Sequence, residues 1–260
     1  MALRIKFLLI FLLTISNIEA VVFNGDLTKI LVAKPGEIFN VKLTMTNNKD
    51  VPEEVHINQA DYKYNSNGEN FFEEPNTLER SNAKWLELHQ QSVRIEPGQT
   101  KDVYYTVRVP NNPQLKGSYS SAILIEPTEP VTTLQAENAV SIQIKVRYAH
   151  QIIVNVGALE KSLKLLDSNL LKTDTGHTLN MDVENNGNCH LYPHPTLKLY
   201  DLKGQLVKTM QAAPQNILPY NSVRFSLPLE EISEGEYYGL LLLDVGNGKL
   251  FAERLSLSIH

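Results

Sequence analysis

The sequence has a single cysteine, a single tryptophan and, after its first twenty residues, no long apolar run. With Cys189 alone, no intramolecular disulfide can form. A chain without disulfides must be stabilised by burial of apolar side chains, which favours full-sized domains over small cross-linked ones. No stretch after residue 20 is apolar for the roughly 18 residues that a membrane helix needs. We therefore expect a mature chain with no membrane span.

Motifs of the common enzyme classes are also missing. The sequence contains no G-x-S-x-G, no H-E-x-x-H and no glycine-rich phosphate loop. Acid–base catalysis needs carboxylates paired across a cleft, and the spacing of the acidic residues indicates no such pair. The pairs Glu73-Glu74 and Glu230-Glu231 are expected to be solvated loop residues. The sequence thus predicts a protein that is not an enzyme and has no cofactor.

One cluster has the residue types of a metal site. Cys189, His190 and His194 form a C-H-x-x-x-H pattern. This spacing fits a helix better than a region interrupted by Pro193 and Pro195, and no second ligand pair stands nearby. The alternative is a buried small thiol beside two loop histidines, and we predict no metal.

The first twenty residues have the pattern of a secretory signal peptide. Arg4 and Lys6 precede the apolar run 7–15, and Ala20 ends an acceptable cleavage site. The expected location is the periplasm or the cell exterior. A formal net charge of −5 argues against nucleic acid or anionic lipid as the main partner.

Period-2 alternation runs through almost the whole of the remaining chain. In the segments 39–45 and 103–109 apolar residues alternate with polar ones, as in half-buried strands, and no segment has the pattern of an amphipathic helix. The second half repeats the order of the first: a strand, an Asn-rich turn, a Pro turn, a strand and a Gly-x-Tyr strand. The predicted fold class is therefore all-β, with two tandem immunoglobulin-like sandwiches over residues 21–156 and 157–260. Trp85 is expected in the core.

The longest alternating stretch is Asn138 to Val156, which we predict to be one extended edge strand at the end of the first sandwich. Such an edge can bind another chain by strand addition. Lys145 and Arg147 are expected on the opposite face from the apolar row. They either form a solvated face or bind acidic groups of a partner. The apolar row comprises Val140, Ile142, Ile144 and Val146, followed by Tyr148.

Several of these features together resemble bacterial periplasmic pilus chaperones. They are the signal peptide, two immunoglobulin-like domains, the Trp85 strand followed by RIEPGQTKDVYYTVRVP, and the alternating strand before the domain junction. The resemblance implies that an exported, pilin-like subunit is bound by strand addition. The implied donor residues are Val140, Ile142, Ile144 and Val146. A basic pair holds the subunit's carboxylate in this family, and Lys29, on the expected first strand, and Arg147 are the nearest candidates.

The first half is similar also to the peptidoglycan-binding domain of WxL-interacting surface proteins. The similarity rests on the segments PGEIFNVKLTMTNN, DYKYNSNGE and VRVPNNPQLKGSYSSAILIEP. It implies a surface module that binds peptidoglycan or another surface protein through loops around residues 65–82. Both partners remain open at this point.

Overall fold

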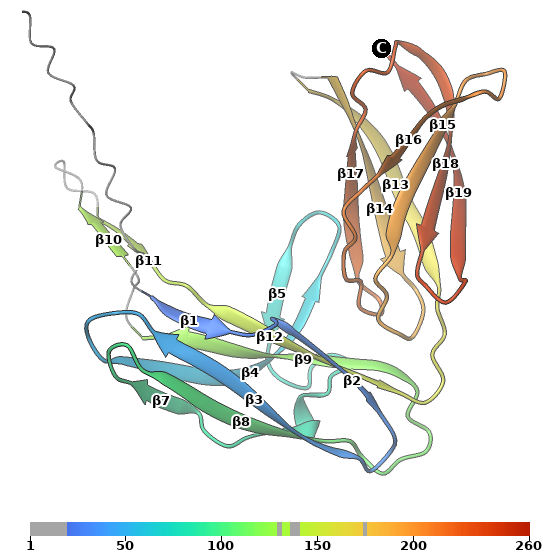
Figure 1. The fold of residues 1–260 in the computed structure, drawn as a ribbon. Coiled ribbons are helices and arrows are strands. Elements are labelled where there is room, and N and C mark those ends of the chain that lie inside the picture. The colour runs from blue at the N-terminus through green and yellow to red at the C-terminus, as the bar shows by residue number, and fades with distance from the viewer. Residues whose placement is uncertain (1–19, 129–131, 136–140, 174–175) are drawn as a thin grey trace, which may run out of the picture.

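A computed structural model describes residues 20–128, 132–135, 141–173 and 176–260. The described chain consists of β-strands and one 3-10 turn, and it forms two β-sandwiches (Figure 1). The predicted fold class is therefore confirmed. Within the described residues, no helix is long and apolar enough to cross a membrane. The predicted signal peptide, apart from Ala20, lies outside the described residues.

The first sandwich packs a four-stranded sheet, in the order β1-β3-β8-β6, against a six-stranded one. The larger sheet has the order β2-β12-β9-β4-β5, and β7 also pairs with β4. All neighbours are antiparallel except β2 and β12, which run parallel. The 3-10 turn spans Ala83–Trp85. The strands are β1 (Val21–Asn24), β2 (Thr28–Ala33), β3 (Ile38–Asn47), β4 (Glu53–Tyr64), β5 (Asn70–Glu73), β6 (Leu86–Leu88), β7 (Ser92–Ile95), β8 (Thr100–Arg108), β9 (Gly117–Pro127) and β12 (Tyr148–Val156).

The core of the first sandwich follows from the alternation in its strands. In β3, Leu43 and Met45 are fully buried, and their polar neighbours along the strand are not. They pack in one cluster with buried residues of the other sheet, among them Ile57, Ile123 and Ile152. Trp85 is 9% exposed and packs on Tyr119 with ring centroids 4.7 Å apart. Its predicted core position is confirmed.

The second sandwich is built on the same principle from two antiparallel sheets. One has the order β13-β14-β17 and the other β16-β15-β18-β19, and the cluster between them includes Leu179, Met181, Phe225 and Leu241. In Figure 1 its strands run roughly from top to bottom, whereas those of the first sandwich run from side to side. The strands are β13 (Leu163–Thr173), β14 (Gly176–Asn185), β15 (His194–Tyr200), β16 (Leu206–Gln211), β17 (Ser222–Pro228), β18 (Gly235–Asp244) and β19 (Leu250–Ile259).

The predicted single strand from Asn138 to Val156 is wrong. The described part contains two strands: β11 (Ser141–Ile144) pairs with β10 (Thr132–Gln135), and β12 pairs with β9 and β2. Residues 145–147 between them belong to no strand. β12 is therefore central in its sheet and not an edge strand. The run Ile152 to Val154 is buried throughout, so this part of β12 is covered on both faces.

The segment 71–82 is polar and without periodicity and so predicts a loop, which is wrong at its start, because residues 71–73 belong to β5. β5 pairs with the end of β4, and the two strands are joined by the turn Asn65 to Asn70, which the Asn-Gly pair in NSNGEN predicts. Gly68 N donates to Asn65 O in this turn. The strand leaves no period-2 pattern in this polar segment, because both Phe71 and Phe72 are exposed and the strand has no buried face.

Candidate partner-binding surfaces

The hairpin β10–β11 is a two-stranded sheet of its own. Its register places Thr132 opposite Ile144 and Leu134 opposite Ile142. Within the described part of the chain, neither strand pairs with any third strand. The hairpin projects from the end of the first sandwich that is distant from the second (Figure 1). Two of the predicted donor residues, Ile142 and Ile144, thus lie on a strand with an unpaired outer edge.

The other predicted contact residues of this segment lie just before or after β11. Val140 is outside the described residues. Val146 is half-buried, and Lys145 is exposed, both in the connection between β11 and β12. The Arg147 guanidinium forms an ion pair with Glu126 of β9. Arg147 is thus held against the first sandwich, whereas Lys145 extends into solvent.

Lys29 lies on β2, the edge strand of the six-stranded sheet, opposite Ile152. Its side chain is exposed. Arg147 precedes Ile152 by five residues, which corresponds to about 16 Å in an extended chain. The structure therefore does not bring Lys29 and Arg147 together as a pair. On the same strand, Ile30 and Val32 are 47% and 78% exposed.

A buried histidine lies close to Lys29. His150 of β12 is 4% exposed, and its ring nitrogens contact Asp26 O at 3.0 Å and the Tyr105 hydroxyl at 3.1 Å. Burial lowers the pKa of His150, and the nearby Lys29 ammonium lowers it further, although the bond to Asp26 O acts in the opposite direction. The histidine is a neutral packing residue with both ring nitrogens engaged.

The β4–β5 hairpin connects the first sandwich to the second. Tyr64 N donates to Asn221 Oδ1 at 2.8 Å, and Ser66 N donates to Ser222 Oγ at 3.0 Å. The Tyr64 hydroxyl donates to Asn216 O and accepts from Leu218 N. The tip of the hairpin is thus packed on the second sandwich, so this part of the region 65–82 is not a free recognition loop.

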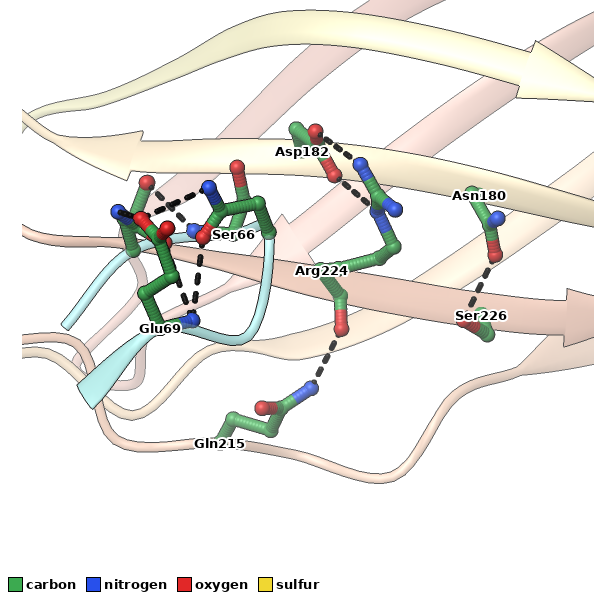
Figure 2. A network of polar contacts seen from close by, with 10 residues as sticks. Ser66, Glu69, Asn180, Asp182, Gln215, Arg224 and Ser226 are labelled. Atoms are coloured by element: carbon green, nitrogen blue, oxygen red, sulfur yellow. Dashed lines mark hydrogen bonds and ion pairs between the residues drawn. The ribbon is translucent and has the colours of Figure 1, made fainter.

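Figure 2 shows the polar network where this tip meets β14 and β17. Arg224 donates from Nε and Nη2 to the two carboxylate oxygens of Asp182, each at 2.7 Å. The Arg224 guanidinium, with a smaller contribution from Ser66, lowers the pKa of the Asp182 carboxyl. A bidentate pair of this geometry fixes both side chains. The Arg224–Asp182 pair thus gives the hairpin tip a rigid polar surface to pack against.

A second contact between the sandwiches involves Arg80. Its guanidinium carbon contacts the faces of two rings, 5.4 Å from the centroid of Tyr119 and 5.6 Å from that of Tyr220. Beside it, Ser118 N donates to Asn188 O at 2.8 Å, and His190 N donates to Ser118 Oγ at 2.7 Å. The two sandwiches are therefore joined at two separate places, the hairpin tip and the Arg80 contact.

Between these contacts and β2 lies a cleft of about 520 Å³, lined by both sandwiches. Its floor includes Ala122 of β9 and Ala149 of β12, and Tyr62 and Phe72 form a wall. Tyr192 and Gln215 contribute from the second sandwich. No pattern in the sequence predicts this cleft directly. The sequence feature that could have indicated the cleft is alanine at strand positions 60, 122 and 149, because a larger side chain there would fill the space above the sheet.

The predicted metal-type residues have other partners. The Cys189 thiol is buried and lies 3.5 Å from Glu160 O, and His190 Nε2 contacts Asn216 Oδ1 at 2.7 Å. The His194 ring packs edge-on against Tyr192. Among the described residues, no group of three His, Cys, Asp or Glu side chains is placed to hold a metal ion.

The sequence matches no family model and no curated protein. Solved structures with a similar fold include the fimbrial chaperones, the group that the sequence motifs resemble. A chain of the chaperone–tip adhesin complex of CFA/I fimbriae is 14% identical with a TM-score of 0.49, covering 90% of this chain and 97% of that one. The class 5 fimbriae chaperone CfaA is 15% identical with a TM-score of 0.48, covering 90% and 98%.

A further similar structure is the E. coli chaperone DraB. It is 14% identical with a TM-score of 0.42, covering 91% of this chain and 98% of that one. At these identities and TM-scores, similarity by itself assigns no function to this chain.

Proposed function

We propose that this protein is a non-enzymatic, periplasmic, chaperone-like protein that binds an exported subunit by β-strand addition along β11. The observation that carries the proposal is the isolated hairpin β10–β11. A two-stranded hairpin is at best marginally stable alone in water. Its unpaired edges present main-chain donors and acceptors that a partner strand can satisfy.

Side chains would supply most of the affinity. Each added main-chain hydrogen bond contributes only about 0.5 to 1.5 kcal/mol net. The apolar row Val140, Ile142, Ile144 and Val146 repeats at every second residue, so its members would share one face if this segment became extended along a partner strand. In this proposal the row enters a groove between the partner's sheets, where burial of each aliphatic side chain contributes about 1.5 to 3 kcal/mol.

Three basic residues are the proposed contacts for acidic groups of the subunit. Lys145 is exposed beside the apolar row, and Lys29 is exposed on β2. Arg147 pairs with Glu126, so it would have to exchange this carboxylate for one of the partner. Because Lys29 lies apart from the other two, we propose that it contacts a different part of the subunit.

The test replaces Ile142 and Ile144 together with aspartate. We expect this variant to lose co-purification of the subunit from a periplasmic extract of cells that make both proteins, with an unchanged circular dichroism spectrum. The matched control replaces Ser141 and Gln143, the alternate residues of the same strand, with aspartate and should retain the subunit. Full retention by the isoleucine variant would contradict the proposal.

Two further features belong to the proposal. Cleavage after Ala20 would leave Val21 as the first residue of the exported chain, which mass spectrometry of the secreted protein tests. The boundary between residues 156 and 157 predicts that residues 21–156 resist limited proteolysis as one fragment. A different N-terminus or a cut within β12 would contradict these two assignments.

The alternative is a surface module of the WxL-interacting type. Retention of the purified protein on isolated peptidoglycan, together with no subunit co-purifying with the unaltered protein from the periplasmic extract, would favour that alternative.

A further inference from the structure

The cleft between the two sandwiches differs from the rest of the surface in its charge. One residue in five of this chain is charged, yet among the residues that the structure describes no Asp, Glu, Lys or Arg lines the cleft. Its lining combines aromatic rings, small aliphatic side chains and amides. A charged ligand entering it would lose hydration without gaining a partner of opposite charge. The cleft therefore suits an uncharged ligand.

The aromatic side chains of the lining come from both sandwiches. On the first sandwich, Tyr62 and Phe72 stack with ring centroids 5.0 Å apart, and the Tyr62 hydroxyl donates to Asn70 Oδ1 at 2.8 Å, which fixes the ring. Phe72 is 39% exposed. On the second sandwich, Tyr192 is 46% exposed and also lines the cleft. These exposed rings offer apolar faces to a ligand.

Amide groups supply the polar contacts. Gln151 of β12 lines the cleft, and its Nε2 is buried with no hydrogen-bond partner among the described residues. Gln215 Nε2 donates to Arg224 O, which orients its carboxamide as Figure 2 shows. A buried donor without a partner costs about 1 to 3 kcal/mol. A ligand hydroxyl or carbonyl that reached Gln151 after a small side-chain rotation would remove that cost.

The floor of the cleft argues against an extended peptide as the ligand. Ala122 and Ala149 lie on β9 and β12, and both strands are paired on their two sides. They present the face of a sheet, whose main-chain groups are already bonded, so strand addition cannot occur there. On this floor, recognition must come from flat apolar contact and side-chain amides, and only the edge strands β2 and β5, which also line the cleft, have unpaired main-chain groups.

We propose that this cleft binds a neutral oligosaccharide. A pyranose ring has an apolar C–H face that stacks on an aromatic ring and hydroxyl groups at its edge that bond to amides. Phe72 and Tyr192 are the proposed stacking residues, and Gln151 and Gln215 the proposed hydrogen-bonding residues. The site uses no residue of β11, so substitutions can separate it from the proposed strand addition.

The test titrates the intact mature protein with cellohexaose and with chitohexaose, monitored by nuclear magnetic resonance shifts and calorimetry. We expect saturable binding of at least one of them. Phe72→Ala and Tyr192→Ala should each weaken it at least tenfold. Tyr238→Ala, which removes an exposed tyrosine of the second sandwich outside the cleft, should leave it unchanged. The variant with aspartate at 142 and 144 should bind the saccharide as the unaltered protein does.

Three outcomes would overturn the proposal. They are no saturable shift with either saccharide, equal affinity in the Phe72 and Tyr192 variants, and saturation of the cleft by an uncharged peptide in place of the saccharides. The Gln151→Leu variant tests the role of the Gln151 amide, because it removes the side-chain donor that has no partner in the free protein. We expect it to weaken saccharide binding without lowering the melting temperature, and unchanged saccharide binding would contradict the role given to Gln151.

Discussion

Asn47 and Asn185 hold equivalent turns in the two sandwiches through the same set of hydrogen bonds. Each is fully buried at the end of its strand, β3 or β14. The side-chain Nδ2 of each asparagine donates two hydrogen bonds, one to the carbonyl oxygen of the residue four positions later and one to the carbonyl oxygen of an isoleucine before the Pro turn. The side-chain Oδ1 accepts a hydrogen bond from the backbone N–H of the residue two positions later. The side-chain partners are Val51, Ile95 and Lys49 for Asn47, and Cys189, Ile217 and Gly187 for Asn185, at 2.7 to 3.0 Å.

Replacing either asparagine with alanine should destabilise its own sandwich strongly. Three main-chain groups would lose their partner at a buried site, at about 1 to 3 kcal/mol for each group left unsatisfied. We expect a loss of at least about 3 kcal/mol in urea unfolding for Asn47→Ala and for Asn185→Ala. Asn67→Ala, at the exposed β4–β5 tip, is the control and should change stability by less than about 0.5 kcal/mol. Small losses for both buried variants would contradict this role.

The turn that follows shows where the two repeats differ. Gly98 has φ +67°, and Tyr220, at the corresponding position, has φ +63°. A left-handed conformation costs a non-glycine residue about 1 to 2 kcal/mol. The second sandwich accepts this cost at the position where the Tyr220 ring covers Arg80.

A double-mutant cycle with Tyr220→Gly and Arg80→Met tests this relation. Tyr220→Gly alone relieves about 1 to 2 kcal/mol of backbone strain and loses a cation–π contact of about 0.5 to 1 kcal/mol, so we expect a small net gain in stability. In the Arg80→Met background only the relief remains, and stability should rise by more. The interaction energy from urea unfolding should be about 0.5 to 1 kcal/mol. Additive effects would show that Tyr220 has another reason for its conformation.

Gly117→Ala should break the Arg80 contact between the sandwiches. Its φ is +92°, and a Cβ would lie 2.2 Å from Asn188 O and 2.8 Å from Arg80 Nη1. Gly68→Ala is a matched control, since Gly68 has φ +89° with open space around it. We expect about 1 kcal/mol of destabilisation for the control, from backbone strain alone. The Gly117 variant should lose clearly more, and equal losses would contradict the clash.

Stability should fall on acidification because of two histidines. Burial is the main cause that lowers the pKa of His150 and of His190 in the folded protein. The unfolded chain therefore binds protons that the folded one does not, once the pH falls below about 6.5. Above that pH the contribution of the two histidines to the free energy of unfolding does not change with pH. Below it, unfolding free energy should fall by up to about 1.4 kcal/mol per pH unit for each histidine.

The double variant His150→Gln and His190→Gln should have a weaker dependence of urea unfolding on pH between about 5 and 7. Glutamine keeps a hydrogen-bonding side chain at both sites. His56→Gln, at an exposed position, should retain the dependence of the unaltered protein. An unchanged slope in the double variant would assign the acid sensitivity to other groups.

Cys189 should be inert in the folded protein. Its side chain is buried, and burial raises the pKa of its thiol. We expect Ellman's reagent to label less than a tenth of the protein under native conditions and the single thiol completely in urea. Rapid stoichiometric labelling of the folded protein would show that this region opens readily.

The sequence predicts the fold better than the surfaces. Burial of one sheet face leaves a period-2 pattern in each strand, so the strands around Leu43, Val103 and Leu179 were predictable locally. The break at residues 145–147 was not, since the apolar residues keep alternating while the strand changes its partner from β10 to β9. The cleft was hidden because it needs residues of both sandwiches, which no local pattern relates.

The two contacts between the sandwiches have a consequence for the cleft. The hairpin tip and the Arg80 contact bind different parts of the second sandwich. A single contact would serve as a pivot, whereas two separated contacts remove the rotation about either one. The distance between Phe72 and Tyr192 is then determined when the protein folds. A ligand in the cleft would not have to close a hinge, and its binding would lose little conformational entropy of the protein.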